Sequence, residues 1–269
     1  MLTAVLVPES LAGVRDALDD GAGPLAGGTY LMPRLNEADP RPTRLVSLRK
    51  AGLDGVAVTR AAVTLGATLT LARVEDDDRL AVLHACVRAI AARPVRTLAT
   101  VAGNLFVPQP YGDLAVALLA LDAEIELYGP QGSRLQQLRA LLDTGVRRGE
   151  LVTAVRFAPP GDFRFHKAGR RRFNSASIVT VAACLDESDG VVRGARIALG
   201  GVVPAPVRCE PAERALVGRP LGPESVRAAT EAADAVIEPF DDAYASAWYR
   251  RRVFGVHLRR ALFGRAGIG

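Results

Sequence analysis

Two short loops of small residues are the part of this sequence best suited to chemistry. The first, Leu25 to Met32, reads LAGGTYLM, and the second, Thr100 to Asn104, reads TVAGN. Each follows a short apolar run, and small residues let successive backbone N–H groups converge on one anion. Two such loops can hold a diphosphate between them, although a tight turn is the commoner use of a Gly-Gly pair.

Neither loop matches the common phosphate-binding motifs. GAGPLA at Gly21 to Ala26 has two glycines of a dinucleotide-binding G-x-G-x-x-G motif, but alanine stands third, a proline interrupts it and no apolar helical pattern follows. The Gly-Lys-Ser/Thr ending of a P-loop is absent. We therefore expect neither a Rossmann nor a P-loop site.

Composition limits the classes of function. The chain has 269 residues, 49% hydrophobic and 23% charged, which suits one large domain or two smaller ones. Its net charge is +5, but aromatics make up only 5% and no basic run is interleaved with them, so we expect no nucleic-acid binding. No apolar run reaches the roughly 18 residues of a membrane span. The first residues lack a basic signal-peptide start, so a cytoplasmic location is expected.

The residue types that usually hold metals or hydrolyse substrates are scattered. Cys86, Cys184 and Cys209 are far apart, without any C-x-x-C spacing, and the three histidines form no pattern. We expect no disulfide framework and no zinc or iron–sulfur site made by this chain alone. No Ser-His-Asp set or carboxylate pair suggests a hydrolase.

Hydrophobic periodicity predicts the elements that position the loops. Strands or hairpins are expected at 2–8, 44–48, 55–71, 124–127 and 150–158, with helices before Pro94 and from about Leu114, where Asp113 stands as an N-cap. The segment PPGD, at Pro159 to Asp162, is the best linker candidate. Three strands follow, two of them joined by an ESDG turn, and the last helix is expected from about 243 to 263. The chain therefore reads as a mixed α+β unit followed by an antiparallel sheet backed by helices.

Six segments in one order resemble a known family: LAGGTYLMP, TLATVAGNL, GDLAVALLALDAEIEL, ELVTAVRF, FHKAGRR and WYRRRVFGVHLRRAL. Together they are similar to the FAD-binding subunit of the xanthine dehydrogenase and carbon monoxide dehydrogenase family of molybdenum hydroxylases. The resemblance implies an α+β fold with a two-lobed FAD-binding domain of the vanillyl-alcohol oxidase (PCMH) type over residues 1–160, its lobes divided near 52–55. A smaller C-terminal α+β domain with an antiparallel sheet would cover residues 163–269.

The resemblance also implies a function. FAD would be the cofactor of this chain, whereas the molybdopterin cofactor and two [2Fe–2S] clusters would belong to a large and a small partner subunit in a dimer of heterotrimers. The chain would pass electrons from the clusters through FAD to NAD, a quinone or oxygen. The alternative is a non-catalytic scaffold or assembly subunit that keeps the fold and has lost FAD. The substrate of the complex is left open.

The family's FAD contacts are carried over residue by residue. The first loop would hold the diphosphate, and the second would add the side chains of Thr100 and Asn104. Val152 would lie against a ring of FAD, and Asp113 and Lys167 would contact the cofactor; a core strand position, a helix N-cap and a surface lysine are the alternatives for these three. The full set is Leu25, Ala26, Gly27, Gly28, Thr29, Tyr30, Leu31, Met32, Thr100, Val101, Ala102, Gly103, Asn104, Asp113, Val152 and Lys167. No side chain of this chain is expected to be catalytic or to bind a metal.

Two residues depart from the family pattern. Ala102 stands where the family usually has glycine, which would cost on the order of 1 kcal/mol if the backbone there has a positive φ. Tyr30 stands where a small polar residue is common, so its ring would crowd the diphosphate or turn outward.

The C-terminal helix carries a cluster of arginines, Arg250, Arg251, Arg252, Arg259 and Arg260, among Trp248, Val253, Val256 and Leu258. One interpretation is a core helix with a solvated arginine face. The other is that the arginines meet acidic groups of a partner subunit.

Overall fold

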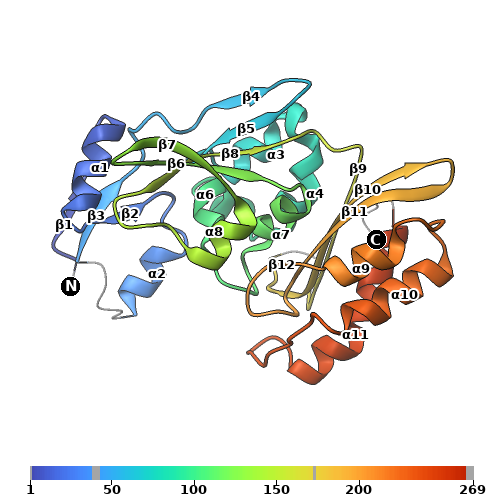
Figure 1. Ribbon diagram of the computed structural model, residues 1–269. Helices are drawn as coiled ribbons and strands as arrows, with labels where there is room; N and C mark the ends of the chain where they lie inside the picture. The colour runs from blue at the N-terminus through green and yellow to red at the C-terminus, as the bar shows by residue number, and fades with distance from the viewer. Residues whose placement is uncertain (1, 38–42, 172–173, 265–269) are drawn as a thin grey trace. The chain divides into compact units, whose positions relative to one another are not determined.

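The computed structural model describes residues 2–37, 43–171 and 174–264, drawn in Figure 1. The chain forms two compact units. Unit 1 contains Met1–Arg79, Arg93–Val107 and Glu124–Phe157, and unit 2 contains Leu80–Ala92, Pro108–Ala123 and Ala158–Gly269. Two segments of the N-terminal half thus belong to the same unit as the C-terminal sheet, which the sequence pattern does not reveal.

A small parallel sheet of unit 1 brings the first loop into place. Its order is β1 (Ala4–Leu6), β3 (Arg44–Ser47), β2 (Gly23–Leu25). Helix α1 (Leu11–Asp19), whose N-cap Ser10 accepts a hydrogen bond from the N–H of Gly13, packs Val14, Ala17 and Leu18 against this sheet. Strand β2 ends at Leu25, so the first loop lies between β2 and α2 (Leu31–Asn36).

The second sheet of unit 1 is antiparallel. Its order is β4 (Val56–Val58), β5 (Val63–Gly66), β8 (Leu151–Phe157), β6 (Glu124–Gly129), β7 (Gly132–Gln137). Burial alternates along β6, as expected for a strand with one face on the core. The helices of this part of unit 1 are α3 (Leu71–Asp76), α5 (Arg93–Arg96), α6 (Val101–Leu105) and α8 (Leu138–Thr144). Unit 1 therefore contains two separate sheets, and the division of residues 1–160 into two lobes near 52–55 stays a prediction.

Unit 2 is built on an antiparallel sheet of order β12 (Val207–Arg208), β11 (Val191–Gly200), β10 (Ser177–Ser188), β9 (Asp162–Gly169). The predicted turn between β10 and β11 is confirmed, with positive φ at Asp189 and Gly190. Helix α7 (Asp113–Ala120) packs on β10 and β11, and α4 (Ala81–Ala89) packs on β9. The remaining helices of unit 2 are α9 (Glu210–Leu216), α10 (Pro223–Ala233) and α11 (Ala247–Phe263), and the short helix η1 (Asp78–Leu80) spans the boundary between the two units in the sequence.

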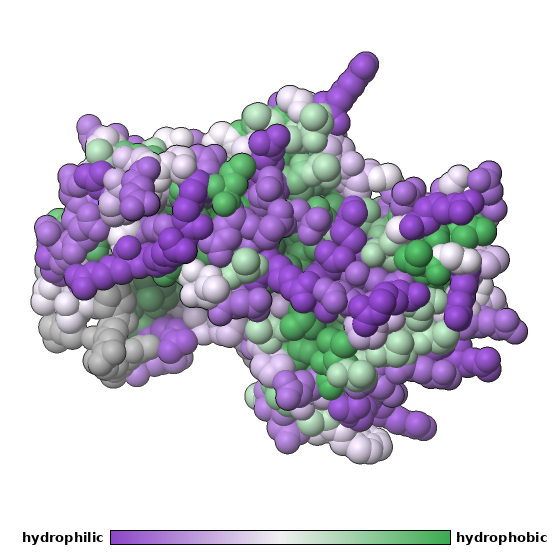
Figure 2. All heavy atoms as spheres, viewed as in Figure 1, coloured by the Kyte–Doolittle hydropathy of each residue, from purple (hydrophilic) through white to green (hydrophobic). Residues whose placement is uncertain are grey.

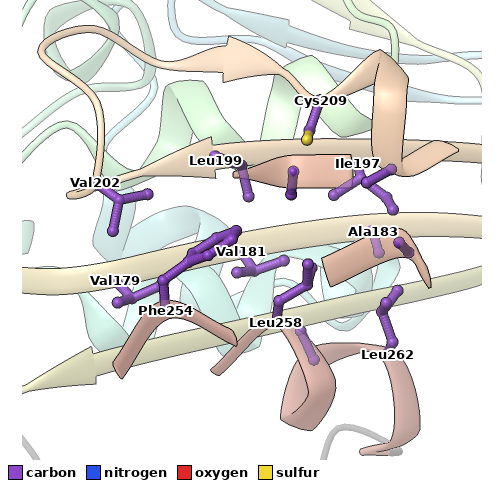
Figure 3. Close-up of a cluster of buried hydrophobic side chains, with 14 of the residues drawn as sticks. Val179, Val181, Ala183, Ile197, Leu199, Val202, Cys209, Phe254, Leu258 and Leu262 are labelled. Carbon is purple, nitrogen blue, oxygen red and sulfur yellow. The ribbon is translucent and has the colours of Figure 1, made fainter. Parts of the chain in front are cut away.

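The core of unit 2 lies between the sheet and its C-terminal helices. Figure 3 shows Phe254, Leu258 and Leu262 of α11 beside alternate residues of β10, among them Val179 and Val181. Alternation along β10 sends Thr180 to the opposite face, where it bonds the first residue of α7. The sheet therefore carries helices on both faces. The expected α+β class, with an antiparallel sheet in the C-terminal part, is confirmed.

The surface is mainly polar. Hydrophilic residues cover most of the face seen in Figure 2, and apolar residues show in separate areas. Within the described ranges, no helix combines the length and the apolar character needed to cross a membrane.

A histidine pair joins β9 to α11 within unit 2. His166 Nε2 lies 2.9 Å from His257 Nδ1, and the rings stack with centroids 5.2 Å apart. Burial lowers the pKa of both rings below the ordinary 6.5, and that of His257 to about 4, with Arg260 acting in the same direction. Both imidazoles are therefore neutral in the folded state near pH 7.

The pair makes the stability of unit 2 depend on pH. In the unfolded chain both histidines take up protons near pH 6.5, whereas folded His257 resists protonation until about pH 4. The free energy of unfolding should therefore fall as the pH drops from about 6.5 to about 4. Urea unfolding at several pH values would measure this fall, and His257→Gln should flatten it. An unchanged slope in the variant would show that other groups cause the pH dependence.

Candidate functional site

A cavity of about 430 Å³ within unit 1 is lined by both predicted loops. Its walls include Leu25–Leu31 of the first loop and Thr100 and Ala102–Asn104 of the second, together with Leu151 and Val152 of β8. Met32 and Val101 are not part of its lining. The volume is within the usual range for small-molecule sites. The structure thus brings together most of the residues predicted from the two loops.

The first loop offers a row of free backbone donors. Within the described ranges, no hydrogen-bond acceptor faces the N–H groups of Gly27, Gly28, Thr29 and Tyr30. The carbonyl oxygen of Gly28 accepts a hydrogen bond from the N–H of Met32. Gly28 has φ +71°, the left-handed conformation that lets neighbouring N–H groups turn toward one point. Four successive donors of this kind suit the diphosphate of FAD.

The two glycines have different roles. A Cβ at Gly27 would lie 1.8 Å from the carbonyl oxygen of Leu98, so what approaches this residue is the backbone that leads into the second loop. At Gly28 the nearest atoms are flexible side chains of Leu25 and Met32, both at 3.2 Å. Gly27 is needed for close contact between two backbones, and Gly28 for its positive φ.

In the second loop, the backbone N–H groups from Val101 to Asn104 are already bonded within the protein. The N–H groups of Val101 and Ala102 bond the carbonyls of Leu69 and Ala67 at 2.9 and 3.0 Å. The N–H of Gly103 bonds Thr100 Oγ1 at 3.1 Å, as Thr100 is the N-cap of α6. This loop therefore offers the cavity mainly side chains and shape, and the row of free backbone donors belongs to the first loop.

Ala102 is not strained. It lies inside α6 with a helical backbone and is absent from the residues with positive φ. The cost that the sequence suggested for alanine at this position therefore does not arise, because the condition for it is not met. The methyl group is buried, with 7% of the residue exposed.

Replacing Ala102 by glycine should leave FAD binding no tighter and lower the free energy of unfolding by about 1 kcal/mol, since glycine adds backbone entropy to the unfolded chain. Urea unfolding and FAD titration measure the two effects. Ala12→Gly, at an exposed position of α1, is a matched control for the helix effect. Tighter FAD binding by the Ala102 variant would show that alanine does strain the loop.

Tyr30 is held by the next turn of its own segment. Its hydroxyl accepts a hydrogen bond from Arg34 Nη1 at 2.9 Å, and the Arg34 guanidinium lies 5.5 Å from the ring centroid. Tyr30 remains part of the cavity lining. The arrangement holds the ring of Tyr30 against its own helix, α2.

Glu150 is a cavity residue that the sequence did not single out. Among the described residues that line the cavity, it alone is charged. Arg134 donates to its carboxylate from Nε at 2.7 Å and from Nη2 at 2.6 Å. That ion pair holds the pKa of Glu150 below its ordinary value. No sequence signal marks the pair, because it forms only when β7 lies near the start of β8.

Asp113 and Lys167 lie in unit 2 and are not part of the cavity lining. Asp113 is the first residue of α7 rather than its N-cap, which is Gly112, so the N-cap interpretation was wrong. Its carboxylate instead accepts hydrogen bonds from Ser177 and Thr180, each at 2.6 Å, and from Lys167 Nζ at 2.7 Å. Lys167 also donates to the carbonyl of Ala89 at 2.9 Å. Asp113 is fully buried and only 10% of the Lys167 side chain is exposed, so the surface-lysine interpretation is wrong as well. The FAD contact of both residues stays a prediction.

Two family models cover almost the whole chain. One, described as the FAD binding domain in molybdopterin dehydrogenase, matches residues 2–159, and one described as the CO dehydrogenase flavoprotein C-terminal domain matches residues 164–263. The chain belongs to the FAD-binding subunits of the molybdenum hydroxylases. It is therefore an FAD-dependent oxidoreductase subunit of this family, as its sequence predicts.

Relatives and solved structures agree with this assignment. The carbon monoxide dehydrogenase medium chain of Afipia carboxidovorans is 31% identical, over 95% of this chain and 93% of the relative. The glyceraldehyde dehydrogenase medium chain of Sulfolobus acidocaldarius is 27% identical, over 90% of each chain. Among structures, CO dehydrogenase from Oligotropha carboxidovorans has a TM-score of 0.91 at 30% identity, over 97% of this chain and 96% of that chain. Quinoline 2-oxidoreductase from Pseudomonas putida 86 also has a TM-score of 0.91, at 25% identity over 99% and 97%.

Proposed function

We propose that this chain is the electron-transfer subunit of a molybdenum hydroxylase complex, with FAD held in the cavity of unit 1. A large subunit would carry the molybdopterin cofactor, and a small subunit would carry two [2Fe–2S] clusters that deliver electrons here. Bound FAD supplies redox chemistry that accepts electrons singly and releases them singly or in pairs. The acceptor is NAD, a quinone or oxygen.

The row of free N–H groups from Gly27 to Tyr30 is the observation that carries this proposal. An anion on these donors satisfies four polar groups at once, which fixes the position of the diphosphate. Thr29 adds a hydroxyl, and the apolar wall at Leu151 and Val152 offers a surface for a ring of the cofactor. The chain's own work is to bind and orient FAD and to limit its contact with water.

The test begins with the purified chain. It should bind FAD at one equivalent and show flavin absorbance, and ADP should compete with FAD because it carries the same diphosphate. A chain that folds but takes up no flavin in solution would favour the scaffold function instead.

The electron-transfer step needs the assembled complex. Reduction of the complex through its molybdenum subunit, followed by rapid mixing with NAD, a quinone or oxygen, should identify the acceptor as the one that reoxidises the flavin fastest. A complex that turns over equally well without FAD in this chain would contradict the proposal. The arrangement as a dimer of heterotrimers and the cytoplasmic location stay predictions.

A further inference from the structure

Helix α11 has an exposed stripe that its own fold does not use. The buried residues of the helix include Arg250, Phe254 and Leu258, which face the sheet of unit 2. On the other side, residues recur at helical spacing and bring two arginines into line with three large apolar side chains. These residues, which we call the α11 stripe, are Trp248, Arg252, Val256, Arg259 and Phe263.

The apolar members of the stripe are unusually open to solvent. Trp248 is 73% exposed, Phe263 44% and Val256 39%. At 1.5 Å per residue, the stripe runs for roughly 22 Å along the helix. A row of large apolar side chains at the surface indicates contact with another molecule more strongly than a single one does.

The arginines of the stripe are free, unlike their neighbours on the same helix. Arg250 is fully buried and donates to the carbonyls of Ser177, Ile178 and Gly201 and to the carboxylate of Asp242. Arg251 donates to the carbonyl of Ile237 and lies 3.8 Å from Asp234. Arg252 and Arg259 form no ion pair or side-chain hydrogen bond within the described ranges. Arg250 and Arg251 thus hold α11 in place, whereas the other two remain available.

We infer that the α11 stripe docks this chain onto a partner subunit whose surface offers carboxylates around an apolar centre. The inference rests on the proposed function, because it assumes a complex of several subunits. Tryptophan and arginine dominate the energy of protein interfaces, and arginine binds carboxylates with two hydrogen bonds. An acidic partner surface complements the two free guanidinium groups.

Other occupants fit the stripe less well. A second copy of this chain would place arginines against arginines. A membrane surface needs an apolar face separate from the cationic one, but here the arginines alternate with the apolar residues along one line and the apolar face proper packs on the sheet.

The test measures binding of the FAD-loaded chain to the purified core of molybdenum and iron–sulfur subunits. The variant Arg252→Glu/Arg259→Glu should weaken binding about a hundredfold, and Trp248→Ala about tenfold, while flavin content and unfolding remain unchanged. Arg60→Glu/Arg219→Glu, which makes the same change in net charge at exposed positions elsewhere, should bind like the wild type.

Trp248 also supplies a direct signal, since it is the one tryptophan of the chain. With fluorotryptophan incorporated into this chain alone, its ¹⁹F resonance should shift on addition of the partner core and not on addition of anionic vesicles or DNA. Unchanged affinity of the double-arginine variant, or a shift with vesicles or DNA instead, would overturn the inference. A wild-type chain that binds no core would also overturn it, together with the proposed function.

Discussion

A Gly28→Val variant is expected to fold and to purify without FAD. Gly28 has φ +71°, which costs a residue with a side chain about 1–2 kcal/mol and a β-branched residue more. Relief of this strain turns the backbone away and disperses the free N–H groups of the first loop. We expect FAD affinity to fall at least about tenfold, measured by flavin fluorescence titration.

Gly132→Val is the matched control for this variant. Gly132 is the first residue of β7, directly after the turn from β6, with φ +92°, and a Cβ there meets no atom within 4 Å. The backbone strain in Gly132→Val should lower the free energy of unfolding about as much as in Gly28→Val. Gly132 does not line the cavity, so FAD should remain bound. Full FAD occupancy in Gly28→Val would show that the first loop is wrongly assigned.

An Asp113→Ala variant is expected to lose about 3–5 kcal/mol of unfolding free energy. Asp113 has no exposed surface, and its carboxylate is the acceptor for Lys167, Ser177 and Thr180. Without it, the largely buried ammonium group of Lys167 loses its counter-ion, and two hydroxyl groups lose their acceptor. Urea unfolding monitored by circular dichroism measures this loss.

Two further variants separate the charge from the hydrogen bonds. Asp162→Ala removes a half-exposed carboxylate that pairs with Arg164, and should cost less than about 1 kcal/mol. Asp113→Asn keeps an acceptor for the hydroxyl groups and should lose less than Asp113→Ala. A loss below about 1 kcal/mol for Asp113→Ala would contradict the buried pair, and flavin content of the folded variant tests the predicted FAD contact of Asp113.

The sequence predicted those features that depend on local pattern. Two apolar runs joined by the ESDG turn predicted β10 and β11, and the small residues of the two loops predicted part of the cavity wall. The backbone conformation at Ala102 could not be predicted from the sequence, because an alanine in place of a motif glycine does not reveal whether φ is positive there. The partners of the Asp113 carboxylate could not be predicted either. An acidic residue at the start of a helix can cap that helix or pair with a lysine far away in the sequence.

Long-range packing was the other feature that the sequence could not predict. All eight residues of α7 are buried, and such an apolar helix predicts burial without naming the sheet that covers it. The Arg134–Glu150 pair likewise depends on strand order, which the sequence alone does not state. Such features follow from tertiary contacts and not from periodicity.

The interleaved units have a consequence for synthesis on the ribosome. Helix α7 ends at Ala120, but the strand β11 on which it packs ends at Gly200. Because translation adds ~5–20 residues per second, roughly 4–16 s pass between the synthesis of α7 and that of the end of β11. The nascent chain therefore exposes the apolar segment of α7 for that time. A gene fragment that starts at Ala158 would produce the sheet of unit 2 with one face uncovered.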